Sequence, residues 1–218
     1  ATSPNQLWCW DITYLPSAIK GQYFYWYMMM DVFSRKIVAH EVHPHEGMLE
    51  ASQLLRRASL AEGRILQPLV LHADNGAAMK GSTMLATMQR LGIAPSRSRP
   101  GVSNDNPYSE SLFKTLKYGP EFPERFGSLS EARQFMDAFA QWYNHEHRHT
   151  GIGLHTPADV HYGLASSKAD QRAAVLAAAR NRHPHRFATN HAPKILDLPE
   201  AAWINQPAHT READTPAA

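Results

Sequence analysis

Three acidic residues of this sequence have the types and the surroundings of a metal site. Asp11 stands between Trp10 and Ile12 in an apolar segment, where a charged side chain is costly unless it has a partner. Asp74 ends an apolar run, and Glu110 falls in the first turn of a helix that we predict after a polar loop. Carboxylates that converge repel one another unless cations neutralise them, and their hard oxygen atoms suit Mg²⁺ or Mn²⁺ better than zinc. The three acids therefore predict a divalent-metal site.

Two such ions, roughly 3.5–4 Å apart, could activate an attacking oxygen and stabilise a leaving one in phosphoryl transfer. Each acid taken alone also has an ordinary interpretation. A strand aspartate can be hydrogen-bonded in a turn, Asp74-Asn75-Gly76 is a common turn sequence, and a glutamate near a helix start favours the helix dipole. The prediction of catalysis therefore rests on the combination of the three.

The elements that must position these acids follow from hydrophobic periodicity and turn residues. We predict strands over residues 7–15, 22–33, 36–42, 68–72 and 93–96, and helices between Gly47 and Gly63, over 82–91 and 108–116, and from Ser128 onward. The first three strands form an antiparallel meander. The run 68–72 is apolar without alternation, which is typical of a central strand buried on both faces. The chain is therefore predicted to be a mixed-sheet α/β domain, with Asp11 in mid-strand and Asp74 at a strand end.

The same periodicity predicts which side chains form the core. These are Trp8, Cys9, Trp10 and Trp26 on the strands, Leu49, Leu54, Leu55, Ala58 and Ala61 on the first helix, Met84, Leu85, Met88 and Leu91 on the second, and Leu129, Ala132, Phe135, Phe139 and Trp142 on the last.

The amino-acid composition of the chain changes after about Gly163. We expect a domain over residues 1–163 and an appendage over 164–218, made of an Ala-rich helix near Lys168 to Arg182 and a proline-rich tail. The tail should be extended and then disordered, with Trp203 anchoring it against the domain.

Composition excludes several classes of protein. Of the 218 residues 43% are hydrophobic, enough for a packed core, and the formal net charge is only +2. The most apolar run, residues 23–30, is too short to span a membrane, so we expect no membrane association. The single cysteine, Cys9, excludes internal disulfides and multi-cysteine zinc sites and fits a reducing, cytoplasmic location.

Seven ordered segments resemble the DDE transposases of bacterial insertion sequences, the OrfB-type D(35)E group related to retroviral integrases. They are Trp10-Asp11-Ile12-Thr13, Asp31-Val32-Phe33-Ser34-Arg35-Lys36-Ile37-Val38, His72-Ala73-Asp74-Asn75-Gly76, Ser96-Arg97-Ser98-Arg99-Pro100-Gly101, the stretch from Asp105 to Lys117, Tyr143-Asn144, and Arg148-His149 with Thr156-Pro157. The 35 residues between Asp74 and Glu110 (75–109) are the spacing that names the group.

The resemblance, which covers about residues 7–163, implies an RNase H-like integrase catalytic core with Asp11, Asp74 and Glu110 as catalytic metal ligands. It implies transposition by metal-dependent cleavage, in which water cuts at the element's ends and the freed 3′-hydroxyl attacks target DNA. Two Mg²⁺ or Mn²⁺ ions and a homo-oligomer assembled on DNA are expected with it. The bacterial nucleoid is the expected location.

Basic residues near the acids are candidate DNA contacts. Lys114 and Lys117 share a helix face with Glu110, and in the resemblance the lysine seven residues after the glutamate is the characteristic one. Arg97 and Arg99 precede a Gly/Asn loop and are placed to meet the DNA backbone. Solvated surface side chains are the alternative for all four.

The sequence also departs from the family. Where the family often has polar residues after the second acid, this chain has Ala77-Ala78-Met79, which puts substrate contacts near Asp74 in doubt more than the metal ligand itself. No helix-turn-helix precedes Leu7. Recognition of the element's ends is therefore expected from a missing N-terminal region or from an upstream-frame partner protein.

Two other functions and two histidine groups are compatible with parts of the sequence. A plain nuclease of the same fold would need a fourth carboxylate, which Glu41 or Asp31 could supply, and a decayed, non-catalytic DNA-binding remnant would keep the acids without activity. The group His43-Pro44-His45 lies between a predicted strand and a helix start and is interpreted as loop or helix-cap residues. The group His145 to His149 ends a predicted helix, where cationic side chains favour the helix dipole.

Overall fold

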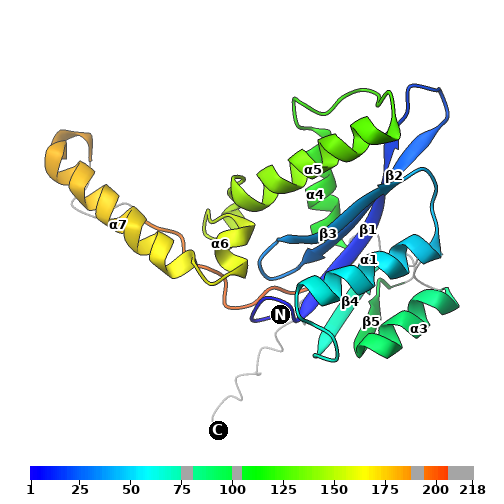
Figure 1. Ribbon diagram of the computed structural model, residues 1–218. Helices are drawn as coiled ribbons and strands as arrows, with labels where there is room; N and C mark the ends of the chain where they lie inside the picture. The colour runs from blue at the N-terminus through cyan, green and yellow to red at the C-terminus, as the bar shows by residue number, and fades with distance from the viewer. Residues whose placement is uncertain (75–80, 100–104, 188–193, 206–218) are drawn as a thin grey trace, which may run out of the picture.

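The computed structural model describes residues 1–74, 81–99, 105–187 and 194–205. Its centre is a five-stranded sheet in the order β3-β2-β1-β4-β5 (Figure 1). The strands are β1 (Leu7–Pro16), β2 (Tyr23–Asp31), β3 (Ile37–His43), β4 (Leu69–Ala73) and β5 (Ile93–Arg97). β1 pairs antiparallel with β2, and β2 with β3, whereas β4 and β5 run parallel to β1. This confirms the predicted meander followed by parallel strands.

Helices cover both faces of the sheet. They are α1 (Met48–Ala61), α3 (Ser82–Leu91), α4 (Pro107–Lys117), α5 (Leu129–His145), α6 (Pro157–His161) and α7 (Ala165–Arg182), with short 3-10 turns η2 (Thr150–Ile152) and η3 (Pro184–Arg186). Successive strand residues point to opposite faces, so Trp8 and Trp10 pack under α1 and α3, while Cys9 and Leu15 pack under α4 and α5. The result is a three-layer domain with two cores.

The residues that begin and end the helices have the conformations expected of such signals. Ser128 caps α5, its hydroxyl accepting a hydrogen bond from the Glu131 N–H at 3.1 Å, and Pro107 occupies the first turn of α4. Gly92 ends α3 with a φ of 71°, a left-handed conformation that glycine adopts without strain.

Four residues predicted for the core are exposed instead. They are Leu49 (58% exposed) and Ala61 on α1, Leu85 on α3 and Trp142 (40% exposed) on α5. Their places are taken by Ala51, Ser52 and Ser59 on α1 and by Met136, Ala140 and Tyr143 on α5. Small side chains and Met136 fit the close contacts between these helices and the sheet. A pattern based on hydropathy alone does not select them.

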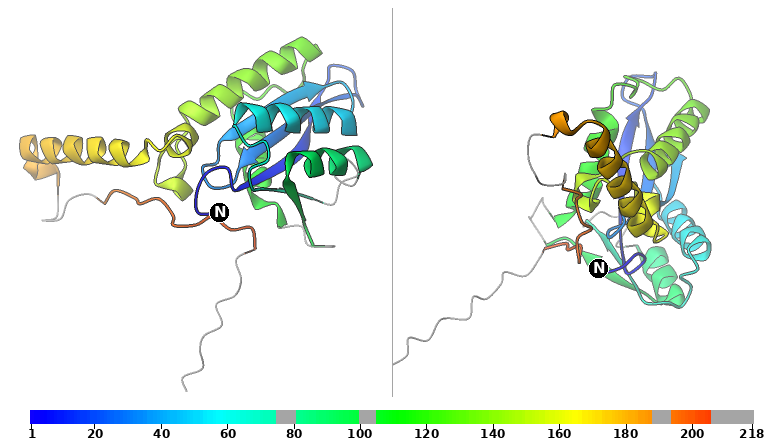
Figure 2. Two further views of the ribbon diagram at one scale, coloured as in Figure 1. Left: turned by 60° about the horizontal axis from the view of Figure 1, so that its bottom comes forward. Right: turned by 90° about the vertical axis from the view of Figure 1, so that its left-hand side faces the viewer.

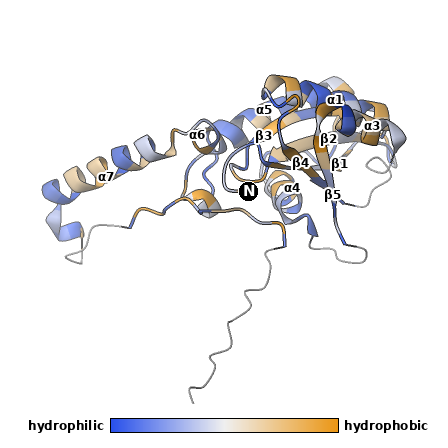
Figure 3. Ribbon diagram, turned by 90° about the horizontal axis from the view of Figure 1, so that it is seen from below, coloured by the Kyte–Doolittle hydropathy of each residue, from blue (hydrophilic) through white to orange (hydrophobic). Residues whose placement is uncertain are grey.

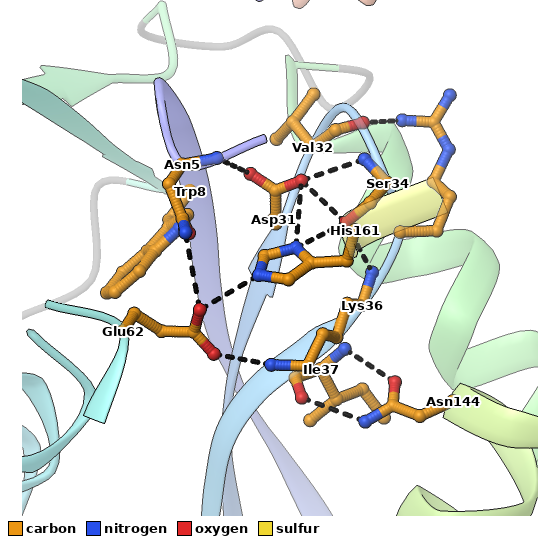
Figure 4. A network of polar contacts seen from close by, with 11 residues as sticks. Asn5, Trp8, Asp31, Val32, Ser34, Lys36, Ile37, Glu62, Asn144 and His161 are labelled. Carbon is orange, nitrogen blue, oxygen red and sulfur yellow. Dashed lines mark hydrogen bonds and ion pairs between the residues drawn. The ribbon is translucent and has the colours of Figure 1, made fainter. Parts of the chain in front are cut away.

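A buried polar cluster ties α6 and the end of α1 to the turn between β2 and β3 (Figure 4). The fully buried Asp31 carboxylate accepts hydrogen bonds from the Ser34 N–H at 2.8 Å and the Ser34 hydroxyl at 2.6 Å. His161 of α6 meets the Ser34 hydroxyl at 3.0 Å and the Glu62 carboxylate at 2.8 Å, and Lys36 pairs with Glu62. We call these residues, Asp31, Ser34, Lys36, Glu62 and His161, the polar cluster.

α7 projects away from the sheet, and a segment over residues 194–205, the return segment, leads back from it to the domain (Figure 2). Only Ala165 of α7 is buried. The return segment is anchored by Ala202, which is 3% exposed and exchanges backbone hydrogen bonds with Ala1 at 2.7 and 2.8 Å. Trp203, predicted to anchor the tail, is 49% exposed, so the anchor is its small neighbour and the backbone. The predicted disorder of the tail end falls on residues outside the described range.

No helix in the described ranges has the length and the apolar character needed to cross a membrane.

Candidate active site

Asp11 lies in the middle of β1, opposite Met28 of β2. Its side chain points to the face covered by α4, because Cys9, two residues earlier on the same face, meets the Ser109 hydroxyl of α4 at 3.6 Å. One Asp11 oxygen accepts a hydrogen bond from the Ile12 N–H at 2.8 Å, and the other faces the Asn106 amide at 3.4 Å. The sheet and α4 therefore hold this carboxylate jointly.

Asn106 is a site residue to which reasoning from the sequence assigned no role. It occupies the N-cap position of α4 but makes no capping hydrogen bond there. Its amide instead donates toward Asp11, while its carbonyl oxygen accepts from the Ser109 hydroxyl at 3.0 Å. The available signal was its position directly before Pro107, where an asparagine is normally interpreted as a helix cap.

The pKa of Asp11 depends on the charges of the other two predicted acids. The pKa of Asp11 is raised to about 7, first by burial and then by the negative charges of Asp74 and Glu110, against the Ile12 N–H and the Lys117 ammonium. Burial in turn lowers the pKa of Lys117, and the charge of Asp11 opposes that shift. Two acids and one lysine from other parts of the chain therefore act on the Asp11 carboxylate.

The acids do not close into a ready-made ligand shell. Within the described ranges no three His, Cys, Asp or Glu side chains form a group that could hold a metal ion. Asp74 is exposed directly after β4, and Glu110 is half-buried on α4. The donor set nevertheless fits a divalent cation, because carboxylates whose mutual repulsion raises a pKa are the groups that such a cation would neutralise.

A second set of contacts joins the two ends of the loop before α4, residues 99 and 105, to each other and to β4. His72 of β4 bonds the Ser96 hydroxyl at 2.9 Å and the backbone oxygen of Asp105 at 2.8 Å. The buried Asp105 carboxylate accepts two hydrogen bonds from the Arg99 side chain, at 2.9 and 3.0 Å, and these hold its pKa well below its usual range. Arg99, a predicted DNA contact, therefore also joins the two ends of this loop.

The other predicted DNA contacts lie on α4 and at the end of β5. Lys114 and Lys117 are exposed in the last turns of α4, and Arg97 is exposed at the end of β5, paired in register with Ala73. The segment Ala77-Ala78-Met79, which departs from the family pattern, lies outside the described residues.

Neither proposed source of a fourth carboxylate faces Asp11. Asp31 is buried in the polar cluster. Glu41 pairs in register with Tyr27 and forms an ion pair with Arg57 of α1, on the opposite face of the sheet. These two positions therefore do not complete a four-acid nuclease site.

The remaining reactive side chains have structural partners. Burial raises the pKa of the Cys9 thiol to about 12, which keeps it protonated and unreactive. His45 bonds Glu50 in the first turn of α1 at 3.0 Å, and His147 and His149 pack against the Tyr143 ring just after α5. The interpretation of these histidines as loop and helix-end residues agrees with those contacts.

The sequence is similar to those of integrase core domains and of bacterial transposases. Two models, each described as an integrase core domain, match residues 1–103 and 91–157. The chain is 32% identical over 163 residues to the transposase for insertion sequence element IS904 of Lactococcus lactis, covering 73% of this chain and 62% of the relative. It is 28% identical over 158 residues to the transposase InsF for insertion sequence IS3A of Escherichia coli, covering 72% of this chain and 54% of the relative. The chain thus spans little more than half the length of these relatives.

Solved structures resemble this fold at low sequence identity. An intasome of simian T-cell lymphotropic virus has a TM-score of 0.59 at 20% identity, covering 92% of this chain and 59% of that chain. The integrase catalytic core domain of HTLV-2 in complex with magnesium has a TM-score of 0.50 at 20% identity, covering 73% and 97%. These likenesses confirm the predicted RNase H-like fold.

The sheet order and these matches place the chain in the class of transposase and integrase catalytic cores. This chain belongs to the integrase core domain family, whose two models together span residues 1–157.

Proposed function

We propose that this chain cuts DNA strands at the ends of an insertion element and joins them to target DNA. The observation that carries the proposal is Asp11, half-buried on a central strand with its pKa raised by burial and by the charges of Asp74 and Glu110. A half-buried acid influenced by two other acids and a lysine is arranged for cation-assisted phosphoryl transfer. Insertion-sequence transposases among the relatives support the choice of substrate.

Asp11, Asp74 and Glu110 would hold Mg²⁺ or Mn²⁺, in two ions by our proposal. The magnesium complex of the HTLV-2 integrase core supports the choice of metal. When bound, the cations would supply Lewis-acid stabilisation of charge on the phosphate and the leaving oxygen. The Asn106 amide and the Ile12 N–H fix the two oxygens of Asp11, so this carboxylate is oriented before substrate arrives.

Lys117 and Lys114 would hold DNA phosphates beside the acids. Lys117 lies close enough to Asp11 to shift its pKa, so a phosphate on this lysine would lie at the edge of the acidic site. Arg97 is proposed as a further backbone contact. Arg99 is proposed to act on DNA and on loop shape together, because its guanidinium also bonds Asp105.

We further propose that the working form is an oligomer on DNA, as the intasome among the structural neighbours suggests. Because the relatives are longer than this chain, we assign recognition of element ends to a helix-turn-helix region or an upstream-frame protein. Activity is assigned to the bacterial nucleoid, where the target DNA lies.

The test is strand transfer, or its reversal on a branched oligonucleotide, with Mn²⁺ as the added ion. We expect Asp74→Asn to abolish activity, by on the order of 10³-fold, since it removes a charge that the metals require. Mn²⁺ titration by calorimetry should show weakened binding in the same variant, with an unchanged circular dichroism spectrum. Asp137→Asn, on an exposed α5 aspartate, is the matched control. An Asp74→Asn variant that cut DNA as well as the parent would refute the assignment.

A further inference from the structure

The positive charge of this protein is concentrated in one part of the chain. Residues 171–196 contain five lysine or arginine side chains and no aspartate or glutamate. The whole chain has 22 basic and 20 acidic residues, so the rest of it has 17 basic against 20 acidic. A chain with a net charge of +2 therefore combines a segment of +5 with a remainder of −3.

The structure places the first part of this segment, residues 171–187, on an extension from the domain. α7 and η3, which we call the arm, project from α6, and the return segment runs back beside them (Figures 1 and 2). An 18-residue helix is about 27 Å long at 1.5 Å per residue. The arm therefore carries its charge well beyond the sheet.

The arm has no apolar stripe that would dock on a protein core. Hydrophilic and weakly hydrophobic residues alternate along α7 (Figure 3), and Ala165 is its one buried residue. A helix that is polar or Ala-rich all round gains little from hydrophobic packing. The chemistry that the arm offers is therefore charge.

Cations and apolar side chains together line the groove between α7 and the return segment. The groove measures about 590 Å³, and its cationic walls, Arg148, Lys168, Arg172 and Lys194, flank the apolar Leu154, Val175, Leu176, Ile195 and Leu196. Arg172 donates hydrogen bonds to the Gly153 and Leu154 carbonyls at 3.0 and 2.6 Å, which fixes the base of the groove. Lys168 and Lys194 are exposed from opposite walls. Two elements thus present ammonium groups to one channel.

Further cations follow at the far end of the arm. Arg182 and Arg186 are exposed, and the exposed His183 and His185 lie between them in the chain. Arginines in a last helical turn also favour the helix dipole. That effect accounts for Arg182, but it does not require the cations at Lys168, Lys194 and Arg186.

The return segment connects this surface to the catalytic helix. The Tyr108 hydroxyl, in the first turn of α4, donates a hydrogen bond to the Trp203 carbonyl at 2.9 Å, and the Arg35 guanidinium lies 4.0 Å from the Tyr108 ring centre. The helix that carries Glu110, Lys114 and Lys117 is therefore in direct contact with the segment that leads from the arm.

We propose that the arm and the groove beside it bind the phosphate backbone of duplex DNA, independently of base sequence and outside the catalytic site. The inference rests on the proposed function, because it extends the DNA that the acids act on to a second contact. Phosphates attract clustered, exposed cations, and each neutralised phosphate releases counterions, so affinity falls as salt rises.

The experiment measures binding of the full chain to a labelled 30-base-pair duplex over a range of salt concentrations, without added metal. The arm variant carries Arg182→Gln, Arg186→Gln and Lys194→Gln. The control carries Lys20→Gln, Arg56→Gln and Arg90→Gln, three exposed cations on the β1–β2 hairpin, α1 and α3. Both lose three charges, so a general effect of net charge would be equal in the two.

We expect the arm variant to bind on the order of tenfold more weakly, with the slope of log affinity against log salt reduced by up to about 2.7, or 0.9 per lost phosphate contact. In the control variant the loss of log affinity and of salt slope should be less than half of that in the arm variant. Two duplexes of unrelated sequence should give the same affinities. Equal losses in both variants, or none in the arm variant, would overturn the proposal.

The outcome is separable from the test of catalysis. An arm variant that binds DNA like the parent, in a protein whose Mn²⁺-dependent activity is lost in Asp74→Asn, would remove the arm from the DNA path and leave the catalytic assignment standing. A parent that bound no duplex DNA would contradict both.

Discussion

Asn144 is a single side chain on which the joint between α5 and the sheet depends. Its amide donates to the Ile37 carbonyl at 3.0 Å and accepts from the Ile37 N–H at 2.9 Å, at the start of β3 (Figure 4). Asn144→Ala leaves both backbone groups without these partners, and we expect about 2–4 kcal/mol lower stability to urea. Gln141→Ala, on the exposed face of the same helix, should change stability by less than about 0.5 kcal/mol. Equal effects of the two would contradict this role.

The polar cluster makes stability depend on pH through two of its residues. Burial raises the pKa of Glu62, but hydrogen bonds from His161 and Lys36 outweigh it and hold the pKa at about 2. Burial lowers the pKa of His161, but the Asp31 and Glu62 carboxylates outweigh it, and the net shift is upward from 6.5. The Glu62 contribution is present above about 4.5 and lost toward pH 2, and the His161 contribution is present below 6.5 and lost as pH rises through its elevated pKa.

We therefore expect the urea midpoint to be highest between about pH 4.5 and 6.5 for these two groups, and to fall as pH is raised to 9. His161→Gln should remove most of the alkaline loss, while His185→Gln, on an exposed residue of η3, should leave it unchanged. An alkaline loss that persisted in His161→Gln would assign it to another group.

At the scale of elements, the return segment restrains the first turn of α4. The Tyr108 hydroxyl bonds the Trp203 carbonyl, so Tyr108→Phe removes one tie at a cost of about 1 kcal/mol. We expect faster amide hydrogen exchange in the first two turns of α4 and a several-fold loss of strand transfer at unchanged metal affinity. Tyr118→Phe, on a side chain 83% exposed just after α4, is the control. Unchanged exchange in α4 would show that the tie is not a restraint.

At the scale of the whole molecule, we propose that the predicted boundary near residue 163 separates a packed domain from the arm. Because Ala165 is the one buried residue of α7, paired substitutions Ala177→Gly and Ala178→Gly should reduce the helical circular dichroism signal, at about 1 kcal/mol of helix propensity each. They should leave the cooperative unfolding midpoint nearly unchanged. Ala132→Gly with Ala140→Gly, on the buried face of α5, should lower that midpoint. A lowered midpoint in the α7 pair would place α7 within the folding unit.

The strands, most helix bounds and the general positions of the acids were predictable from the sequence, because they depend on local signals. Apolar runs, turn residues and caps such as Ser128 and Pro107 act within a few residues of the structure that they specify. Leu49 and Trp142 show where this reasoning fails. Their hydropathy is right for a core, but the angle at which a helix lies on a sheet decides which edge of the stripe is covered, and that angle is a tertiary property.

The sequence by itself determined the kinds and the order of the catalytic candidates Asp11, Asp74 and Glu110, since spacing and residue type are written along the chain. Only the tertiary structure decided what surrounds them. In it the Asn106 amide faces Asp11, the Arg99 guanidinium donates hydrogen bonds to Asp105, and Asp31 and Glu41 lie away from the site. These contacts join residues far apart in the chain, and the burial and charge that shift the pKa of Asp11 exist only after β1 and α4 have packed together.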